Sequence, residues 1–357
     1  MIASVDKDFW SGKKVFITGH TGFKGGWLTL WLIEMGAIVK GYSLPPPTVP
    51  SFFDECCIED LLESEIGDIR DFNHLHKSVL NFKPDVVIHM AAQSLVRESY
   101  DSPVTTYDTN LMGTVNVLES VRLVDDVRVL INITTDKCYE NKEWEWGYRE
   151  EDLLGGYDPY SNSKSCAEFA TASYRQSFFS KSKLQKVVTV RAGNVIGGGD
   201  WAKDRLVPDI LKACGNNESV AIRNPNAVRP WQHVLEPLSG YLILAQSLWN
   251  SDKEYFPAWN FGPHQSSVKS VGWIANKISE LWPRDVHISI DDAKHPHEAS
   301  ILKLDISRAL TRLNWVPKLE IEHALLLTVD WHYAYLNAEN MRDFSLSQIK
   351  DFSGTNG

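Results

Sequence analysis

Short apolar runs with the character of β-strands alternate with helix-compatible segments through the first half of this chain. The runs lie at Lys14 to Thr18, Ile38 to Tyr42, Asp85 to Met90, Val127 to Thr134 and Lys186 to Arg191. Strands that alternate with helices predict a parallel sheet with helices on both faces. Because such sheets bind ligands at the carboxyl ends of their strands, we expect the chemistry of the chain to gather there.

The 357 residues exceed what one core usually organises, since single cores stop growing at about 250 to 300 residues. After about Gly197 the pattern changes to shorter elements rich in Pro, Trp and His. We therefore predict an α/β protein with a doubly wound parallel sheet over 10–197 and a smaller α/β lobe over 198–340. Late strands of the sheet can come from beyond residue 230, and 341–357 is predicted to be a polar tail.

The net charge limits the class of partner, and the cysteines indicate the compartment. The net charge of −10 repels nucleic acids and anionic membrane surfaces, so an anionic small substrate needs a local cluster of Arg and Lys. The amino-terminal segment lacks the apolar stretch of a signal peptide, and no run approaches the roughly 18 apolar residues of a membrane helix. Five cysteines without CxxC spacing fit a reducing compartment, and we predict a cytoplasmic location.

A glycine-rich turn directly follows the first strand. It reads Thr18-Gly19-His20-Thr21-Gly22-Phe23-Lys24-Gly25 and leads into an apolar helical stretch that ends near Met35. Glycines allow unusual backbone angles and let a pyrophosphate approach the main-chain amides, while the helix amino terminus supplies partial positive charge. The turn therefore predicts a dinucleotide site; the alternative is a tight strand-to-helix turn without a ligand.

The residue that usually separates NAD from NADP is missing. Dinucleotide-binding folds often carry an acid about 20 positions after the glycines, and the equivalent stretch here, Lys40 to Ser43, has none. The rule thus leaves the two cofactors open. Asp68 is a candidate for contact with the adenine, although a capped loop explains it equally simply.

Tyr160 and Lys164 are four residues apart near the start of a helix-compatible run, which places both on one face. A cation near a phenol favours the phenolate, so the tyrosine can accept a proton from a substrate alcohol while hydride leaves the same carbon. The strand that ends at Thr134 should reach the same edge of the sheet, and Thr135 is then placed to orient the alcohol. The alternative is an exposed pair of helical neighbours.

Several further segments resemble the extended short-chain dehydrogenases/reductases. The resemblance rests on the glycine turn, the segment His89 to Ser94, Asn110, the Tyr160 to Lys164 motif, the segment Arg191 to Asp200, and Asp305 to Pro317 near the carboxyl end. It spans about residues 14 to 320 and implies a Rossmann domain that binds a nicotinamide dinucleotide and a smaller lobe that binds a nucleotide sugar. Within the family, 4,6-dehydratases carry Thr-Asp-Glu where this chain has Thr135-Asp136-Lys137. With lysine at the third position, this chain resembles the dehydratases that act on CDP-glucose.

The resemblance implies specific roles for residues. NAD is expected to contact Gly19, Thr21, Gly22, Phe23, Lys24, Gly25, Asp68, Ile69, Ala91, Ala92, Gln93, Asn110, Thr134, Tyr160 and Lys164. The nucleotide sugar is expected to contact Ser94, Asn194, Arg205, Arg229 and Glu298. Tyr160 would deprotonate the C4 hydroxyl as hydride passes to NAD, water would leave across C5 and C6, and hydride would return to C6.

Asp136 and Lys137 are the candidates for the elimination. Asp136, kept protonated by burial, would be the acid that releases the C6 hydroxyl as water. Lys137 would be the C5 base if its pKa is lowered, and otherwise a cation that stabilises the enolate. The alternative for both is a solvated loop pair.

Other readings of the chain are another nucleotide-sugar dehydratase (of GDP-mannose or dTDP-glucose), an epimerase, or a binding protein that kept the fold. The retained Tyr160, Lys164 and Thr135 argue against the binding protein. His295-Pro-His297 lacks the spacing of a zinc site, so no metal is expected. In the family that this chain resembles, subunits often contact each other through the helices that hold Asn110 and Tyr160. The resemblance therefore implies a homodimer, with a tetramer as the alternative.

Overall fold

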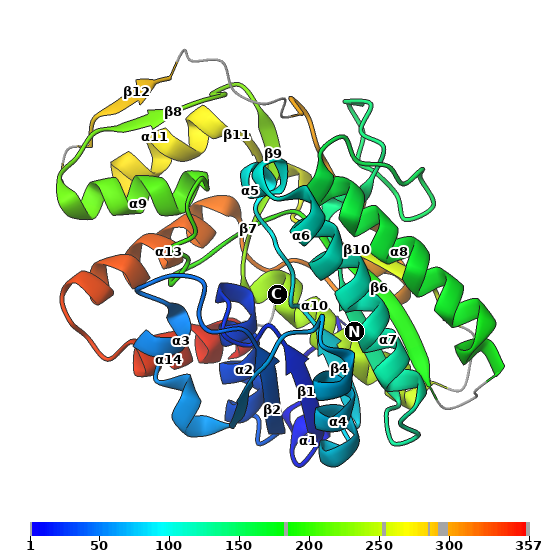
Figure 1. Ribbon diagram of the computed structural model, residues 1–357. Coiled ribbons are helices and arrows are strands. Elements are labelled where there is room, and N and C mark those ends of the chain that lie inside the picture. The colour runs from blue at the N-terminus through cyan, green and yellow to red at the C-terminus, as the bar shows by residue number, and fades with distance from the viewer. Residues whose placement is uncertain (1, 182–184, 252–254, 285, 292–298, 355–357) are drawn as a thin grey trace.

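A computed structural model describes residues 2–181, 185–251, 255–284, 286–291 and 299–354. At its centre lies a seven-stranded sheet in the order β10-β6-β5-β4-β1-β2-β3, with every neighbouring pair parallel (Figure 1). The strands are β1 Lys14–Thr18, β2 Ile38–Ser43, β3 Glu63–Ile66, β4 Val86–His89, β5 Val129–Ile133, β6 Lys186–Ala192 and β10 Ala258–Phe261. The strand order reverses between β1 and β4, which marks the carboxyl edge there as the place for a ligand.

Helices cover both faces of this sheet. One face carries α2 Phe23–Glu34 and α10 Leu235–Asn250, and the other carries α4 Phe72–Phe82, α7 Gly113–Arg122 and α8 Pro159–Ser177. Alternate residues of β1 serve the two cores: Val15 and Ile17 pack with α2, whereas Phe16 packs with α4. Because both faces of the central strands are buried, these strands are largely apolar, which is why the sequence pattern identifies them. The predicted doubly wound sheet is confirmed.

Short helical turns connect these elements. They are α1 Lys7–Trp10, α3 Phe52–Glu55, η1 Ile58–Leu61, α5 Val96–Asp101, α6 Pro103–Tyr107, η2 Asp108–Met112, η3 Asp136–Cys138, η4 Phe179–Lys181, η5 Gln265–Ser267 and α12 Ser307–Arg312. Of these, η2 is a single π-helical turn that joins α6 to α7. No helix within the described residues is both long and apolar enough to cross a membrane.

The smaller lobe lies at the upper left of Figure 1. Its strands are β7 Asn194–Ile196, β9 Val228–His233 and β11 Val268–Ser270 in one sheet, and β8 Val220–Ile222 with β12 Ile288–Ile290 in another. Its helices α9 Leu206–Asn216, α11 Val271–Leu281 and α13 Ile321–Leu336 enclose a core of their own. Between β9 and β11 the chain returns to the main sheet through α10 and β10, so the two lobes are interleaved. A boundary near residue 197 stays a prediction.

The segment predicted to be a polar tail instead forms helix α14, Met341–Gly354. It packs against α2 and α13, at the lower left of Figure 1. The expectation was wrong because the apolar residues of this segment are few and widely spaced, yet Met341, Ile349 and Phe352 all fall on one buried face. The Phe352 ring meets Trp31 of α2 edge to face at 5.8 Å.

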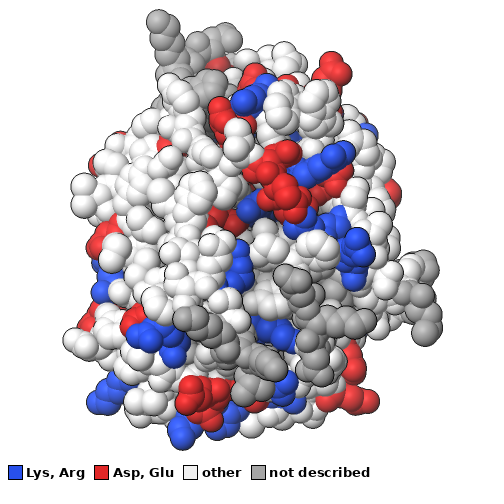
Figure 2. All heavy atoms as spheres, turned by 90° about the vertical axis from the view of Figure 1, so that its right-hand side faces the viewer, with Lys and Arg blue, Asp and Glu red and all other residues white. Residues whose placement is uncertain are grey.

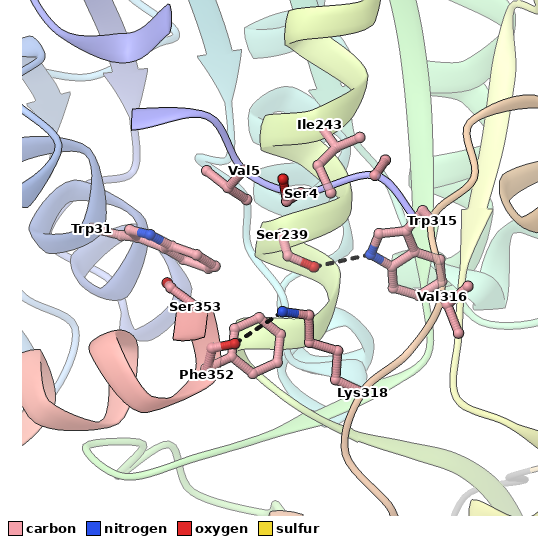
Figure 3. A pocket seen from close by; sticks show the side chains of 11 residues that line it. Ser4, Val5, Trp31, Ser239, Ile243, Trp315, Val316, Lys318, Phe352 and Ser353 are labelled. Carbon is pink, nitrogen blue, oxygen red and sulfur yellow. Dashed lines mark hydrogen bonds between the residues drawn. The ribbon is translucent and has the colours of Figure 1, made fainter. Parts of the chain in front are cut away.

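A small pocket remains where α14 meets the rest of the fold (Figure 3). Lys318 extends across it and donates to the carbonyl of Phe352 at 3.0 Å. Nearby, Glu236 at the start of α10 accepts from the backbone amides of Lys318 and Leu319 at 2.8 and 2.6 Å. Burial raises the pKa of Glu236 to about 7. None of the predicted site residues lines this pocket, which therefore belongs to the attachment of α14 rather than to the catalytic edge.

Candidate active site

The glycine turn joins β1 to α2 with little room to spare. Gly19 has a φ of +80°, and a Cβ there would come within 2.7 Å of the amide nitrogen of Ala91. A Cβ on Gly25 would overlap the carbonyl oxygen of Gly19. Gly22 is the N-cap of α2 and offers no side chain to the first amides of the helix, and the first turn carries no acidic residue. These open amides at a positive helix end fit the pyrophosphate of a dinucleotide.

Neighbouring side chains of the turn fix it to other elements. Thr21 Oγ1 lies 2.9 Å from the hydroxyl of Ser43 and donates to the carbonyl of Leu44, which ties the turn to the end of β2. The ring of Phe23 lies beside Gly197. Lys24 reaches inward, to 3.4 Å from the hydroxyl of Tyr241. Burial, and then the positive charges of Lys164 and Arg205, lower the pKa of Lys24 to about 7.

The loop after β4 lies beside the glycine turn and forms a second wall of the expected cofactor site. Thr18 Oγ1 accepts from the amides of Met90 and Ala91 at 3.1 and 3.2 Å, and these contacts join the loop to the glycine turn. The loop continues through Ala92. Next along the chain, the amide of Gln93 donates to Asn110 Oδ1 at 2.9 Å. Asn110 is buried on the π-helical turn and donates back to the carbonyl of Gln93.

Asp68 follows β3 at the same edge of the sheet. Its carboxylate is held by Arg70, with a shortest N–O distance of 2.6 Å, and this pairing lowers the pKa of Asp68. Ile69 is buried against Gly113, where a Cβ would overlap its side chain. The structure thus brings both residues to the cofactor edge and gives Asp68 a partner that the sequence reading did not foresee.

The segment Thr134 to Lys137 leaves the end of β5. Thr135 Oγ1 donates to Asp136 Oδ1 at 3.1 Å, and the Thr135 hydroxyl lowers the pKa of the nearby Tyr160 phenol. Asp136 is fully buried, and its Oδ2 has no hydrogen-bond partner among the described residues. Lys137 Nζ lies 3.6 Å from Asp136 Oδ1 and is about one-third exposed. The buried Asp136 is therefore not part of a solvated loop pair, and one of its carboxylate oxygens lacks a hydrogen-bond partner among the described residues.

Tyr160 and Lys164 lie on the first turns of α8, which Asp158 caps by accepting from the amide of Ser161. Both are buried, and Lys164 Nζ donates to the carbonyl of Ile133 at 3.0 Å. Burial lowers the pKa of Lys164 to about 8 and raises that of Tyr160 to about 12.

The acidification of Tyr160 by Lys164, expected from their spacing, stays a prediction. The groups that most lower the phenol pKa are the Thr135 hydroxyl and Arg205, and burial outweighs both. Lys164 directs its ammonium to the end of β5.

The predicted substrate residues approach from the smaller lobe. Arg205 pairs with Asp200 at 3.0 Å and donates to Ser94 Oγ at 3.0 Å, so it spans the two lobes. Asn194 on β7 is half-buried, and its Oδ1 has no partner within the described part of the chain. Arg229 is buried on β9 and donates to the carbonyls of Val228 and Ser300. Glu298 lies outside the described residues.

Two arginines that sequence reasoning missed lie near Arg205. Arg97 on α5 and Arg223 after β8 both contact Asp204, each at 3.2 Å. Together with Arg205 they concentrate positive charge between the lobes, as an anionic substrate of a negatively charged protein requires. The signal was weak, because only the position of Arg97 three residues after Ser94 marks it in the sequence.

Within the described ranges no group of three or more His, Cys, Asp or Glu could hold a metal ion.

Known proteins share this architecture over nearly the whole chain. A curated CDP-glucose 4,6-dehydratase of Salmonella typhimurium is 54% identical over 352 residues, which cover 98% of each chain. The solved dTDP-glucose 4,6-dehydratase of Bacillus anthracis in complex with NAD has a TM-score of 0.75 at 20% identity and covers 92% of this chain and 99% of its own. A UDP-glucose 4-epimerase of Stenotrophomonas maltophila with bound NAD has a TM-score of 0.79 at 20% identity, with 91% and 99% covered.

At such identities the two solved structures establish the fold alone. The family model described as GDP-mannose 4,6 dehydratase matches residues 16–327. This chain, with its glycine turn and its Tyr160–Lys164 pair, belongs to the GDP-mannose 4,6-dehydratase family within the short-chain dehydrogenases/reductases.

Proposed function

We propose that the protein is an NAD-dependent CDP-glucose 4,6-dehydratase, which converts CDP-glucose to CDP-4-keto-6-deoxyglucose and water in deoxysugar biosynthesis. The observation that carries the proposal is that a base for alcohol oxidation and an acid for elimination meet at the end of β5, where the buried Tyr160 lies beside Thr135 and Thr135 donates to the fully buried Asp136. The 54% identity to a CDP-glucose 4,6-dehydratase along the whole chain supports the choice of substrate.

Oxidation at C4 is assigned to Tyr160 and Lys164. NAD, when bound, accepts hydride from C4 and later returns it to C6. Tyr160 takes the proton of the C4 hydroxyl. Because a phenol with a pKa of about 12 is protonated at neutral pH, only its ionised form acts as the base, and the Thr135 hydroxyl and Arg205 are the groups that favour this form most.

Elimination is assigned to Asp136 and Lys137. The C4 ketone acidifies the C5 proton, which leaves to a base as the C6 hydroxyl departs. Asp136 supplies the proton that turns this hydroxyl into water, and its unpartnered Oδ2 is the oxygen free to do so. Lys137 acts at C5, either as that base or as the cation that stabilises the enolate. After hydride reaches C6, the C5 carbon takes a proton back from the base, so the balance is the loss of one water, with NAD regenerated.

Substrate contacts are assigned to the residues between the lobes. Arg205 and Arg229 supply cationic donors for the diphosphate, and Asn194 and Ser94 supply polar groups at its edges. Glu298 is retained as a candidate for a hydroxyl contact.

A homodimer through the α6, η2 and α8 surface, or a tetramer built on it, is part of the proposal. Val104, Met112 and Phe169 are exposed there to 81%, 48% and 59%. Figure 2 faces this side and has a broad area without charged side chains left of centre. Such patches are typical of subunit contacts. Nothing in the negative overall charge favours nucleic acid or membrane partners, and we place the enzyme in the cytoplasm.

The test is to incubate the protein with NAD and separate samples of CDP-glucose, dTDP-glucose, UDP-glucose and GDP-mannose, and to follow product mass. We expect loss of one water from CDP-glucose. A product of unchanged mass would identify an epimerase, and bound NAD without any turnover would identify a binding protein.

A variant tests the acid. Asp136→Asn should still oxidise C4, so NADH should accumulate in a single turnover, whereas Asp126→Asn, an exposed control in the turn before β5, should behave as the parent. Normal dehydration by Asp136→Asn would remove Asp136 from the acid role.

A further inference from the structure

A buried ion pair lies directly beneath the Thr134 to Lys137 segment. Glu168 is on α8, one turn after Lys164, and Arg191 is on β6; they are 4% and 3% exposed. Arg191 Nε donates to Glu168 Oε1 at 2.8 Å and Nη2 donates to Oε2 at 2.9 Å. This two-pronged contact fixes the relative orientation of both groups.

The pair holds the catalytic segment at both of its ends. Thr134 Oγ1 donates to Glu168 Oε1 at 2.6 Å. At the other end, Arg191 Nη1 donates to the hydroxyl of Tyr139 at 2.8 Å, and that hydroxyl donates to Asn260 Oδ1 at 2.7 Å. Only the four residues 135 to 138 lie between these two attachments.

Stability alone gives little reason for such a pair. Removing two charges from water is costly, and apolar residues of similar volume often stabilise a fold as well or better. What an apolar pair lacks is the fixed direction of several hydrogen bonds, and here two of them end on the residues that flank Asp136 and Lys137. Tyr160 and Lys164 are positioned by other contacts, namely the Asp158 cap and the carbonyl of Ile133.

We propose that Glu168 and Arg191 are positioning residues for the elimination step: they hold the segment that carries Asp136 and Lys137 against the C5–C6 side of the substrate. The proposal rests on the roles assigned above to Asp136 and Lys137. It predicts that loosening either attachment impairs water loss more than C4 oxidation, so the oxidised intermediate and NADH accumulate.

Glu168→Gln would leave Arg191 as an unpaired buried cation, so the test uses variants that remove single hydrogen bonds. Thr134→Val removes one attachment and Tyr139→Phe removes the other. The matched control is Thr189→Val, because Thr189 Oγ1 also donates to Glu168, at 2.6 Å, but lies on β6 away from the catalytic segment. The readouts are NADH absorbance after mixing with NAD and CDP-glucose, product formation, NAD affinity and thermal unfolding.

We expect Thr134→Val and Tyr139→Phe to slow water loss by about tenfold or more. NADH formation should change little at saturating NAD, a condition that compensates for any loss of the NAD contact expected of Thr134. Thr189→Val should lose comparable stability without trapping NADH. Equal slowing of both steps, or trapping of NADH by the control as well, would overturn the proposal. If Asp136→Asn traps NADH while neither attachment variant does, the positioning role fails and the acid role stands; if Asp136→Asn does not trap it, the acid role itself fails.

Discussion

Replacing Glu236 by glutamine tests how the buried carboxyl at the start of α10 affects stability. Burial raises its pKa to about 7 from an ordinary value of 4.5. The folded protein therefore binds more protons than the unfolded chain between these values. The contribution of Glu236 to the free energy of unfolding is therefore largest below pH about 4.5 and is lost as the pH rises through 7. Between pH 5 and 8 this loss amounts to about 2 to 3 kcal/mol. Glutamine stays neutral in both states and keeps an oxygen for the amides of Lys318 and Leu319.

The assay is urea unfolding of the parent and Glu236→Gln at several values between pH 5 and 8. We expect the parent to lose stability relative to the variant by about 2 to 3 kcal/mol over this range. The exposed Glu322 provides a control, since Glu322→Gln should follow the parent at every pH. Parallel profiles for the parent and Glu236→Gln would refute the reasoning.

Three further outcomes follow from the structure. Tyr160→Phe should lower turnover by about 10²- to 10⁴-fold and leave NAD bound, as measured by product mass and by cofactor retention; normal turnover would contradict its role as the base. The rate of C4 oxidation should rise from pH 7 as more of the Tyr160 phenol ionises, and rise less steeply above pH about 8, where Lys164 loses its proton; a flat single-turnover profile from pH 7 to about 10 would contradict the assignment. Phe352→Ala should lower the free energy of unfolding by about 3 to 5 kcal/mol through its lost contact with Trp31, and an unchanged denaturation midpoint would show that α14 is not part of the core.

The central strands of the fold could be predicted from sequence because they are buried on both faces. Their apolar runs are continuous, and Lys14 to Thr18 matches β1. The edge strands β3 and β10 were not identified individually. The first reads Glu63-Ser64-Glu65 and is only partly buried, and the second is four residues long, so neither gives a strong apolar signal. Helix α14 was missed because its few apolar residues lack a pattern that stands out from a polar surface.

Local motifs identified the parts of the candidate site that depend on neighbouring residues. The glycine turn, the spacing of Tyr160 and Lys164, and the placement of Thr135 at a strand end are of this kind. The environment of the Tyr160 phenol could not be predicted in this way, because Arg205 comes from the other lobe and burial is a property of the whole fold. Glu168 continues the Tyr160–Lys164 spacing by one more turn, so its position could have been noticed. Its four hydrogen-bond donors could not, because three lie on β6 and the fourth is Thr134, directly after β5.

Helix α14, at the carboxyl end of the described chain, packs on the first lobe, so the stability of this lobe depends on residues that are far away in the sequence. Arg342 donates to the carbonyl of Cys56, a contact between residues 286 positions apart, and Phe352 covers Trp31 on the helix that begins at the glycine turn. During synthesis the first lobe therefore emerges with an aromatic face that stays open until residues beyond 340 have been made. Shortened versions that end before α14 should be prone to aggregation. Tags or fusions that displace this helix should loosen α2, whose amino end is the predicted pyrophosphate site, before they disturb anything in the smaller lobe.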